Sequence, residues 1–178
     1  VSGLTGLAEH PTTGVLYAIS TGGQGCTPNL YTLNKDTGAA TLVGPLGESG
    51  GKPDMAFRAD GTLFTYSTSN GYLGTVDLTT GAMTLIGYTG VEPWDQGLTF
   101  DGSGTLIMID GDSVYTVNTT TGSATYVTEH DETNDANMMT THPTTGDIYV
   151  ADSDNSSTTT LNIMNPTTGA FTLLGSNS

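Results

Sequence analysis

Apolar and polar residues alternate in short runs along most of the chain, and polar turns separate the runs. A period of two is typical of half-buried β-strands, and two such strands around a tight turn make a hairpin. One hairpin recurs in four copies, LYTLNKDTGAATLVG (30–44), LGTVDLTTGAMTLIG (73–87), VYTVNTTTGSATYVT (114–128) and LNIMNPTTGAFTLLG (161–175). No segment has a helical period, so the pattern predicts an all-β fold.

A second recurring hairpin lies between these copies. Its copies are GLAEHPTTGVLYAIS (6–20), DMAFRADGTLFTYS (54–67), GLTFDGSGTLIMID (97–110) and MMTTHPTTGDIYVAD (138–152). The turns of both hairpins close on glycine, which adopts the positive φ needed where the chain enters the next strand. Two hairpins per repeat give a unit of four strands.

The repeat length indicates the architecture. Four glycines that close the turns of the first hairpin lie 43, 41 and 47 residues apart, at Gly38, Gly81, Gly122 and Gly169. A four-stranded propeller blade needs roughly 40 to 50 residues. The sequence therefore predicts a single β-propeller domain over 1–178, with four blades of four antiparallel strands at approximately 1–47, 48–90, 91–130 and 131–178.

These blades follow the pattern G-L-x-F-D-P…G-x-L-Y…L-Y-x-[ND]-x-x-T-G-x-x-T-x-[VIL]-G over nearly the whole chain. In this respect the chain resembles secreted bacterial and archaeal β-propeller repeat proteins. The resemblance implies the fold and little else, because that class includes binding modules, enzymes and structural proteins. Function has to be argued from sites.

Small residues recur at one position of the predicted inner strands, at Ala8, Ala56, Thr99 and Thr140. We expect these four residues to lie nearest the axis. Because small side chains favour tight packing at the centre, we expect a single closed four-bladed ring. The alternative is that two chains pool their blades into one eight-bladed ring.

The charge of the chain restricts its partners. Asp and Glu number 18 and Lys and Arg only 3, so the formal net charge is −15. Nucleic acid is excluded as a partner, because phosphate binding needs clustered Lys and Arg, and membrane insertion is not expected. Abundant Thr, Ser, Asn and Gly, little Lys, and N-x-[ST] sequons at Asn118 and Asn155 favour an extracellular or cell-surface location.

Acidic clusters are the strongest chemical candidates. Asp110 and Asp112 occupy the same place between hairpins as Asp152 and Asp154 do in the next blade. Alternating Asp side chains on a tight loop supply the oxygen ligands that Ca²⁺ takes at about 2.3 to 2.6 Å. We therefore predict Ca²⁺ at one or more of these loops, although none completes an EF-hand pattern. The alternative is that these aspartates only form turns.

Trp94 lies in a stretch outside the repeats, between acidic neighbours. An aromatic ring beside carboxylates can stack on a sugar or contact a protein partner, so Trp94 is a candidate binding residue. The alternative is local packing. Cys26 is the single cysteine, which excludes an intramolecular disulfide.

The three histidines favour structural roles. His10 and His142 both precede a Pro-Thr-Thr-Gly turn, and a residue reused by the repeat is expected to form the turn. His130 lies between two acidic residues in a predicted loop. A metal-ligand role there is the minor alternative.

No catalytic motif is present, so we expect no enzyme activity and no catalytic residues. The sequence favours an extracellular structural or self-assembling subunit, of a surface layer or filament, whose partner is the chain itself and which calcium stabilises. One alternative is a module that binds glycan or protein. Another is a propeller enzyme, a lyase or hydrolase, working over the central axis.

Overall fold

The computed structural model describes residues 3–20, 27–48, 51, 54–67, 69–92, 96–130, 135–153 and 159–177. Every regular element among them is a β-strand. Within these ranges there is accordingly no helix that could cross a membrane. The predicted all-β fold is confirmed.

The described residues form sixteen strands in four sheets. Blade 1 contains β1 (Leu4–Glu9), β2 (Leu16–Ser20), β3 (Asn29–Leu33) and β4 (Ala40–Pro45). Blade 2 contains β5 (Met55–Phe57), β6 (Leu63–Ser67), β7 (Tyr72–Val76) and β8 (Met83–Tyr88). Blade 3 contains β9 (Gln96–Phe100), β10 (Leu106–Asp110), β11 (Ser113–Val117) and β12 (Ala124–Glu129). Blade 4 contains β13 (Asp135–Thr141), β14 (Ile148–Ser153), β15 (Thr159–Met164) and β16 (Phe171–Asn177).

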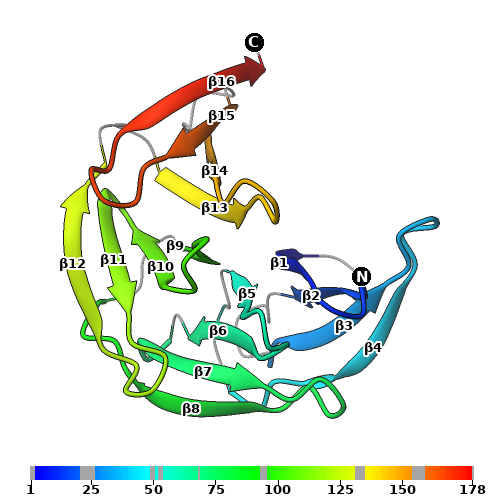
Figure 1. Cartoon of the computed structure of the whole chain (residues 1–178). Coiled ribbons are helices and arrows are strands. Elements are labelled where there is room, and N and C mark those ends of the chain that lie inside the picture. The colour runs from blue at the N-terminus through cyan, green and yellow to red at the C-terminus, as the bar shows by residue number, and fades with distance from the viewer. Residues whose placement is uncertain are drawn as a thin grey trace.

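Each blade is an antiparallel meander in which strands pair in chain order. The first strand of every blade lies at the centre and the fourth lies at the rim (Figure 1). The predicted four-bladed propeller fold is therefore confirmed. The four small residues expected near the axis all lie on the central strands, with Ala8 on β1, Ala56 on β5, Thr99 on β9 and Thr140 on β13.

Local hydrogen bonds explain why the repeat keeps its turn residues. The Asn34 side-chain oxygen accepts bonds from the backbone N–H groups of Asp36 at 3.0 Å and Thr37 at 2.9 Å. The turn then closes on Gly38 at a φ of 70°, where other residues are strained. The same arrangement recurs at Asp77, Asn118 and Asn165.

Three hydrophobic cores lie between successive blades, where burial of apolar surface holds the blades together. The core between blades 1 and 2 contains Tyr17, Ile19, Leu30, Leu46, Met55, Leu63 and Val76. The core between blades 2 and 3 contains Ala56, Phe64, Tyr66, Leu73, Leu98, Phe100, Leu106, Met108 and Val117. The core between blades 3 and 4 contains Ile107, Ile109, Val114, Met139, Ile148, Val150 and Met164.

The four blades form an open arc and not a closed ring (Figure 1). Central strand β1 contacts β5, β5 contacts β9, and β9 contacts β13. No core cluster of the described residues joins blade 4 to blade 1. The expectation that one chain closes its own ring is thus not met. Small residues on the central strands do not suffice to close the circle, because the core clusters of the described residues join only blades that are neighbours in sequence.

Candidate functional site

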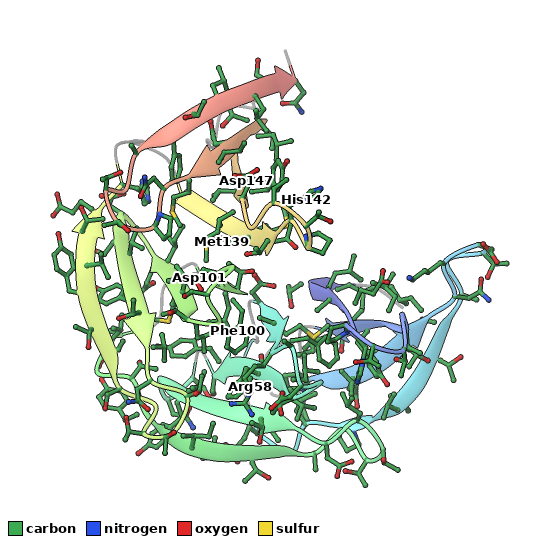
Figure 2. The ribbon with its side chains drawn as sticks, in the orientation of Figure 1. Arg58, Phe100, Asp101, Met139, His142 and Asp147 are labelled. Carbon is green, nitrogen blue, oxygen red and sulfur yellow. The ribbon has the colours of Figure 1, made fainter. Side chains whose placement is uncertain are left out.

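A cleft of about 430 Å³ lies in the opening between blade 1 and blade 4. Most of its walls come from β1, β13, β14 and β15. The residues that line it are Leu4, Thr5, Gly6, Leu7, Leu33, Asp54, Met138, Met139, Thr140, Tyr149, Ala151 and Leu161. Figure 2 shows Met139 on the central strand of blade 4, beside blade 3.

The cleft is apolar although the chain as a whole is strongly acidic. Its walls carry Leu7 and Met138, whose side chains are 58% and 57% exposed. Asp54 is the one residue among the described lining residues that is Asp, Glu, His, Lys or Arg. Exposed apolar patches of this kind mark places where something else binds.

Asp54 is a buried residue of the cleft lining and ties three blades together. Its carboxylate oxygens accept hydrogen bonds from the backbone N–H of Met55 at 2.8 Å and of Leu98 in blade 3 at 3.0 Å. Burial raises the pKa of the Asp54 carboxyl from 3.8 to about 7, although backbone bonds from Leu98, Met55 and Met139 lower it. The Thr65 hydroxyl also donates to the backbone oxygen of Asp54 at 2.9 Å.

The chemistry available to Asp54 is limited by these bonds. A carboxyl with a pKa near 7 is a suitable general acid or base. Both oxygens, however, already accept backbone hydrogen bonds, and no second Asp or Glu and no His, Lys or Arg joins Asp54 among the described lining residues. The arrangement fits a structural link between central strands. A sequence signal existed, because the repeat has glycine at this position in blades 1 and 3, at Gly6 and Gly97.

The predicted calcium residues are only partly described. Asp110 ends β10, and Asp112 is exposed in the following turn. Asp152 has the corresponding place on β14, where its backbone pairs with Thr160. The side chain of Asp152 and all of Asp154 lie outside the described residues. No group of three His, Cys, Asp or Glu side chains converges within the described part of the chain, and the calcium site stays a prediction.

Two further candidates, Trp94 and Cys26, also lie outside the described residues. His10 and His142 are described, and the turn role predicted for them is confirmed. The Nδ1 atom of His142 accepts bonds from the backbone N–H of Thr144 at 3.2 Å and Thr145 at 3.1 Å. His142 thus accepts the two backbone bonds that an Asn side chain accepts in the turn of the first hairpin. His10 does the same in blade 1.

His130 is buried and contacts both blades 3 and 4. Its ring stacks on Phe171 of β16, with centroids 5.1 Å apart and planes 13° from parallel. The Nε2 atom lies 2.9 Å from the backbone oxygen of Gly111. These contacts give His130 a packing role, which the neighbouring acidic residues in the sequence did not indicate.

Comparison with known proteins supports the fold. No protein-family model matches the chain, and no curated protein sequence matches it. Hydrazine synthase of Kuenenia stuttgartiensis matches 98% of this chain with 13% identity and a TM-score of 0.63. TolB of Acinetobacter baumannii matches 98% with 18% identity and a TM-score of 0.64. Virginiamycin B lyase of Staphylococcus aureus matches 96% with 12% identity and a TM-score of 0.62.

These solved structures are propeller proteins, which confirms the resemblance to the propeller class. At such identities the likeness shows the fold alone. The chain spans about half the length of its matches, namely 49% of hydrazine synthase, 44% of TolB and 54% of virginiamycin B lyase. The four blades thus correspond to part of each of these longer chains.

Proposed function

We propose that the chain is a non-catalytic, extracellular propeller unit that works by self-association, as a structural subunit of a layer or filament. The observation that carries this proposal is the apolar face left open between blades 1 and 4. Identical subunits that meet through two different faces generate rings or filaments. An arc of blades with two unpaired end faces has the required geometry.

The charge distribution supports association through this face. Like charges repel, and a net charge of −15 opposes contact between copies over most of the surface. The cleft lining contains Asp54 as its one acidic residue, and the fraction of that carboxyl that is protonated near neutral pH is substantial because burial raises its pKa to about 7. Contact at this face therefore avoids most of the repulsion.

A binding module for glycan or protein is the second candidate. The cleft exposes the side chains of Met138 and Leu161 and includes the ring of Tyr149. Aromatic and apolar walls with few polar groups are typical of ligand pockets. Trp94 remains the candidate contact that the sequence suggests. A glycan array tests this candidate separately from association.

Sedimentation and light scattering over a range of protein and salt concentrations test the proposed function. We expect the mass to rise with protein concentration and with salt, because ions screen repulsion between acidic subunits over about 10 Å at 0.1 M. Calcium should act in the same direction by bridging carboxylates. A protein that stays monomeric under all these conditions would reject self-association, and binding would become the leading function.

A further inference from the structure

We propose that a second copy of the chain occupies the open face, so that two four-bladed chains form one eight-bladed ring. This inference rests on the proposed self-association and specifies its partner, its register and its closure, so that the closed two-chain ring, and not the single chain, is the subunit of a layer or filament. Within the chain, the trailing face of each blade packs against the leading face of the next blade. Blade 4 leaves its trailing face open and blade 1 leaves its leading face open, and these two faces are complementary.

Backbone contact at the rim defines the junction between blades. A Cβ atom at Gly81 would lie 2.5 Å from the Gly44 oxygen, and one at Gly44 would overlap the backbone oxygen of Thr80. The backbone N–H of Met83 then donates to the Leu46 oxygen at 2.8 Å. The same contacts join blades 2 and 3 through Gly87, Thr89, Thr121, Gly122 and Ala124. Between blades 3 and 4 the turn at Gly169 sits on Glu129.

Both halves of this contact are open at the ends of the arc. Gly175 on β16 has the position of Gly44 in the repeat, and Gly38 has the position of Gly81. Among the described residues, a Cβ atom at Gly175 or at Gly38 would have no heavy atom within 4 Å. A second copy can place its Gly38 turn on Gly175. Its Ala40 N–H would then face the backbone oxygen of Asn177.

The central strands also indicate that a further blade packs against the open side of blade 1. Leu7 has the position in the repeat that belongs to Met55, Leu98 and Met139 in the later blades. Those three side chains are 2%, 2% and 7% exposed, because the preceding blade covers them, whereas Leu7 is 58% exposed. A blade placed before blade 1 would bury Leu7 as well.

The contacts between neighbouring blades show which residue of the other copy would meet Leu7. Within the chain, the residue one position earlier in the repeat contacts the equivalent of Leu7 in the next blade. Position Gly6 contacts Met55 of the next blade, and position Gly97 contacts Met139, since a Cβ atom added at Gly97 would lie only 3.3 Å from the Met139 Cβ. Met138 has this position in blade 4 and is 57% exposed. In the ring, Met138 of one copy therefore meets Leu7 of the other.

The outer strand provides a further comparison with an internal control. Leu174 is 50% exposed, whereas Val43 and Ile86 at the same position are half-buried against the core shared with the next blade. Its neighbour Leu173 is also exposed, but so is Leu42 at the corresponding position in blade 1. The side of β16 that would face a following blade is therefore the side that differs from the other blades, because no next blade packs on it among the described residues.

A second copy fits better than an unrelated partner because one chain carries both halves of the junction. Two copies related by a two-fold axis make the same contact twice and leave no end face. Further blades of another polypeptide are the competing occupant, and the experiment below separates the two.

Disulfide trapping tests the register. In a Cys26→Ser background, Leu7→Cys protein and Met138→Cys protein are oxidised alone and as a mixture. Disulfides need Cβ atoms about 3.5 to 4.5 Å apart. We expect a covalent dimer in the mixture and none with either variant alone. The double variant should give a covalent dimer and no larger species. A ladder of polymers, an intramolecular bridge in a monomer, or no cross-link would each overturn the ring.

Gly175→Ala is the matched blocking variant, and Leu173→Ala is its control. The alanine at 175 has open space in the single chain but would overlap the backbone of the partner's turn, so we expect the dimer to be lost with the circular dichroism spectrum unchanged. Leu173→Ala should leave the dimer intact. If Gly175→Ala protein associates as the wild type does, the eight-bladed ring is wrong but self-association still holds. A wild-type monomer at every concentration overturns both and indicates that other blades cover the face.

Discussion

The carboxylate of Asp54 in blade 2 accepts a 3.0 Å hydrogen bond from the backbone N–H of Leu98 in blade 3. A side chain that lines the cleft thus fixes the central strands of two blades relative to one another. Because this carboxyl is buried, its pKa is raised from 3.8 to about 7. We therefore expect the stability of the folded chain to depend on pH through this group.

The first prediction concerns this pH dependence. The folded state keeps the Asp54 proton between pH 3.8 and about 7 while the unfolded state loses it. The free energy of unfolding should thus fall as pH rises through this range, by up to about 1.4 kcal/mol per pH unit from this group. Asp54→Asn should remove that slope in urea unfolding. Above about pH 7 the wild-type curve should level off.

Asp60→Asn is the control for this experiment. Asp60 is exposed, and its hydrogen bond with Arg58 lowers its pKa below the usual range, so it does not titrate between those pH values. The control should keep the wild-type slope. Identical pH profiles for wild type and Asp54→Asn would show that the Asp54 carboxyl is not perturbed.

A second prediction uses the exchange of residues between repeats. His142 accepts two backbone hydrogen bonds in its turn, as Asn34 does in another hairpin. His142→Asn should therefore leave thermal stability nearly unchanged, whereas His142→Ala should cost roughly 1 kcal/mol for the lost bonds. Equal losses for the two variants would mean that the turn does not depend on the side-chain acceptor.

The third prediction compares two glycines with similar backbone geometry, Gly81 at a φ of 78° and Gly38 at a φ of 70°. Alanine at either position incurs strain of roughly 1 to 2 kcal/mol. Only at Gly81 does the new Cβ atom also meet the backbone of Gly44, at 2.5 Å from its oxygen. At dilutions where the chain is monomeric, Gly81→Ala should be the more destabilising change. Equal melting temperatures would contradict the described rim contact.

Much of the fold could be predicted from the sequence because the same pattern of strands and turns occurs four times. The turn residues Asn34 and Gly38, the central position of Ala56 and the structural use of His142 were all predictable from local spacing. Closure was not, because it depends on how whole blades pack on one another, through contacts such as that of Gly44 with Gly81, which are distant in sequence.

The site was less predictable for the same reason. The raised pKa of Asp54 comes from burial of its carboxyl in the folded chain, which its neighbours in the sequence do not indicate. His130 is buried because Phe171, far along the chain, stacks on it. The apolar cleft combines residues near both ends of the sequence, and no local pattern shows that these residues face an opening.

The fourth prediction concerns calcium. We expect Ca²⁺ to raise the melting temperature through the acidic loop that includes Asp152 and Asp154. A ligand that binds only the folded state stabilises it by about 2.7 kcal/mol at one hundred times its Kd. Replacing both aspartates by asparagine should remove the effect, and Asp36→Asn, in an exposed turn elsewhere, should keep it. Magnesium should act more weakly, because it requires stricter octahedral geometry. Coincident melting curves in calcium and in chelator would reject the site.

Electron microscopy of the purified 178-residue chain is the sharpest test of the eight-bladed ring, because views along the axis count the blades. We expect closed rings of eight blades with two-fold symmetry, in which blade 4 of each copy lies against blade 1 of the other. Particles that remain open arcs of four blades, or that close as rings of four, would rule this assembly out.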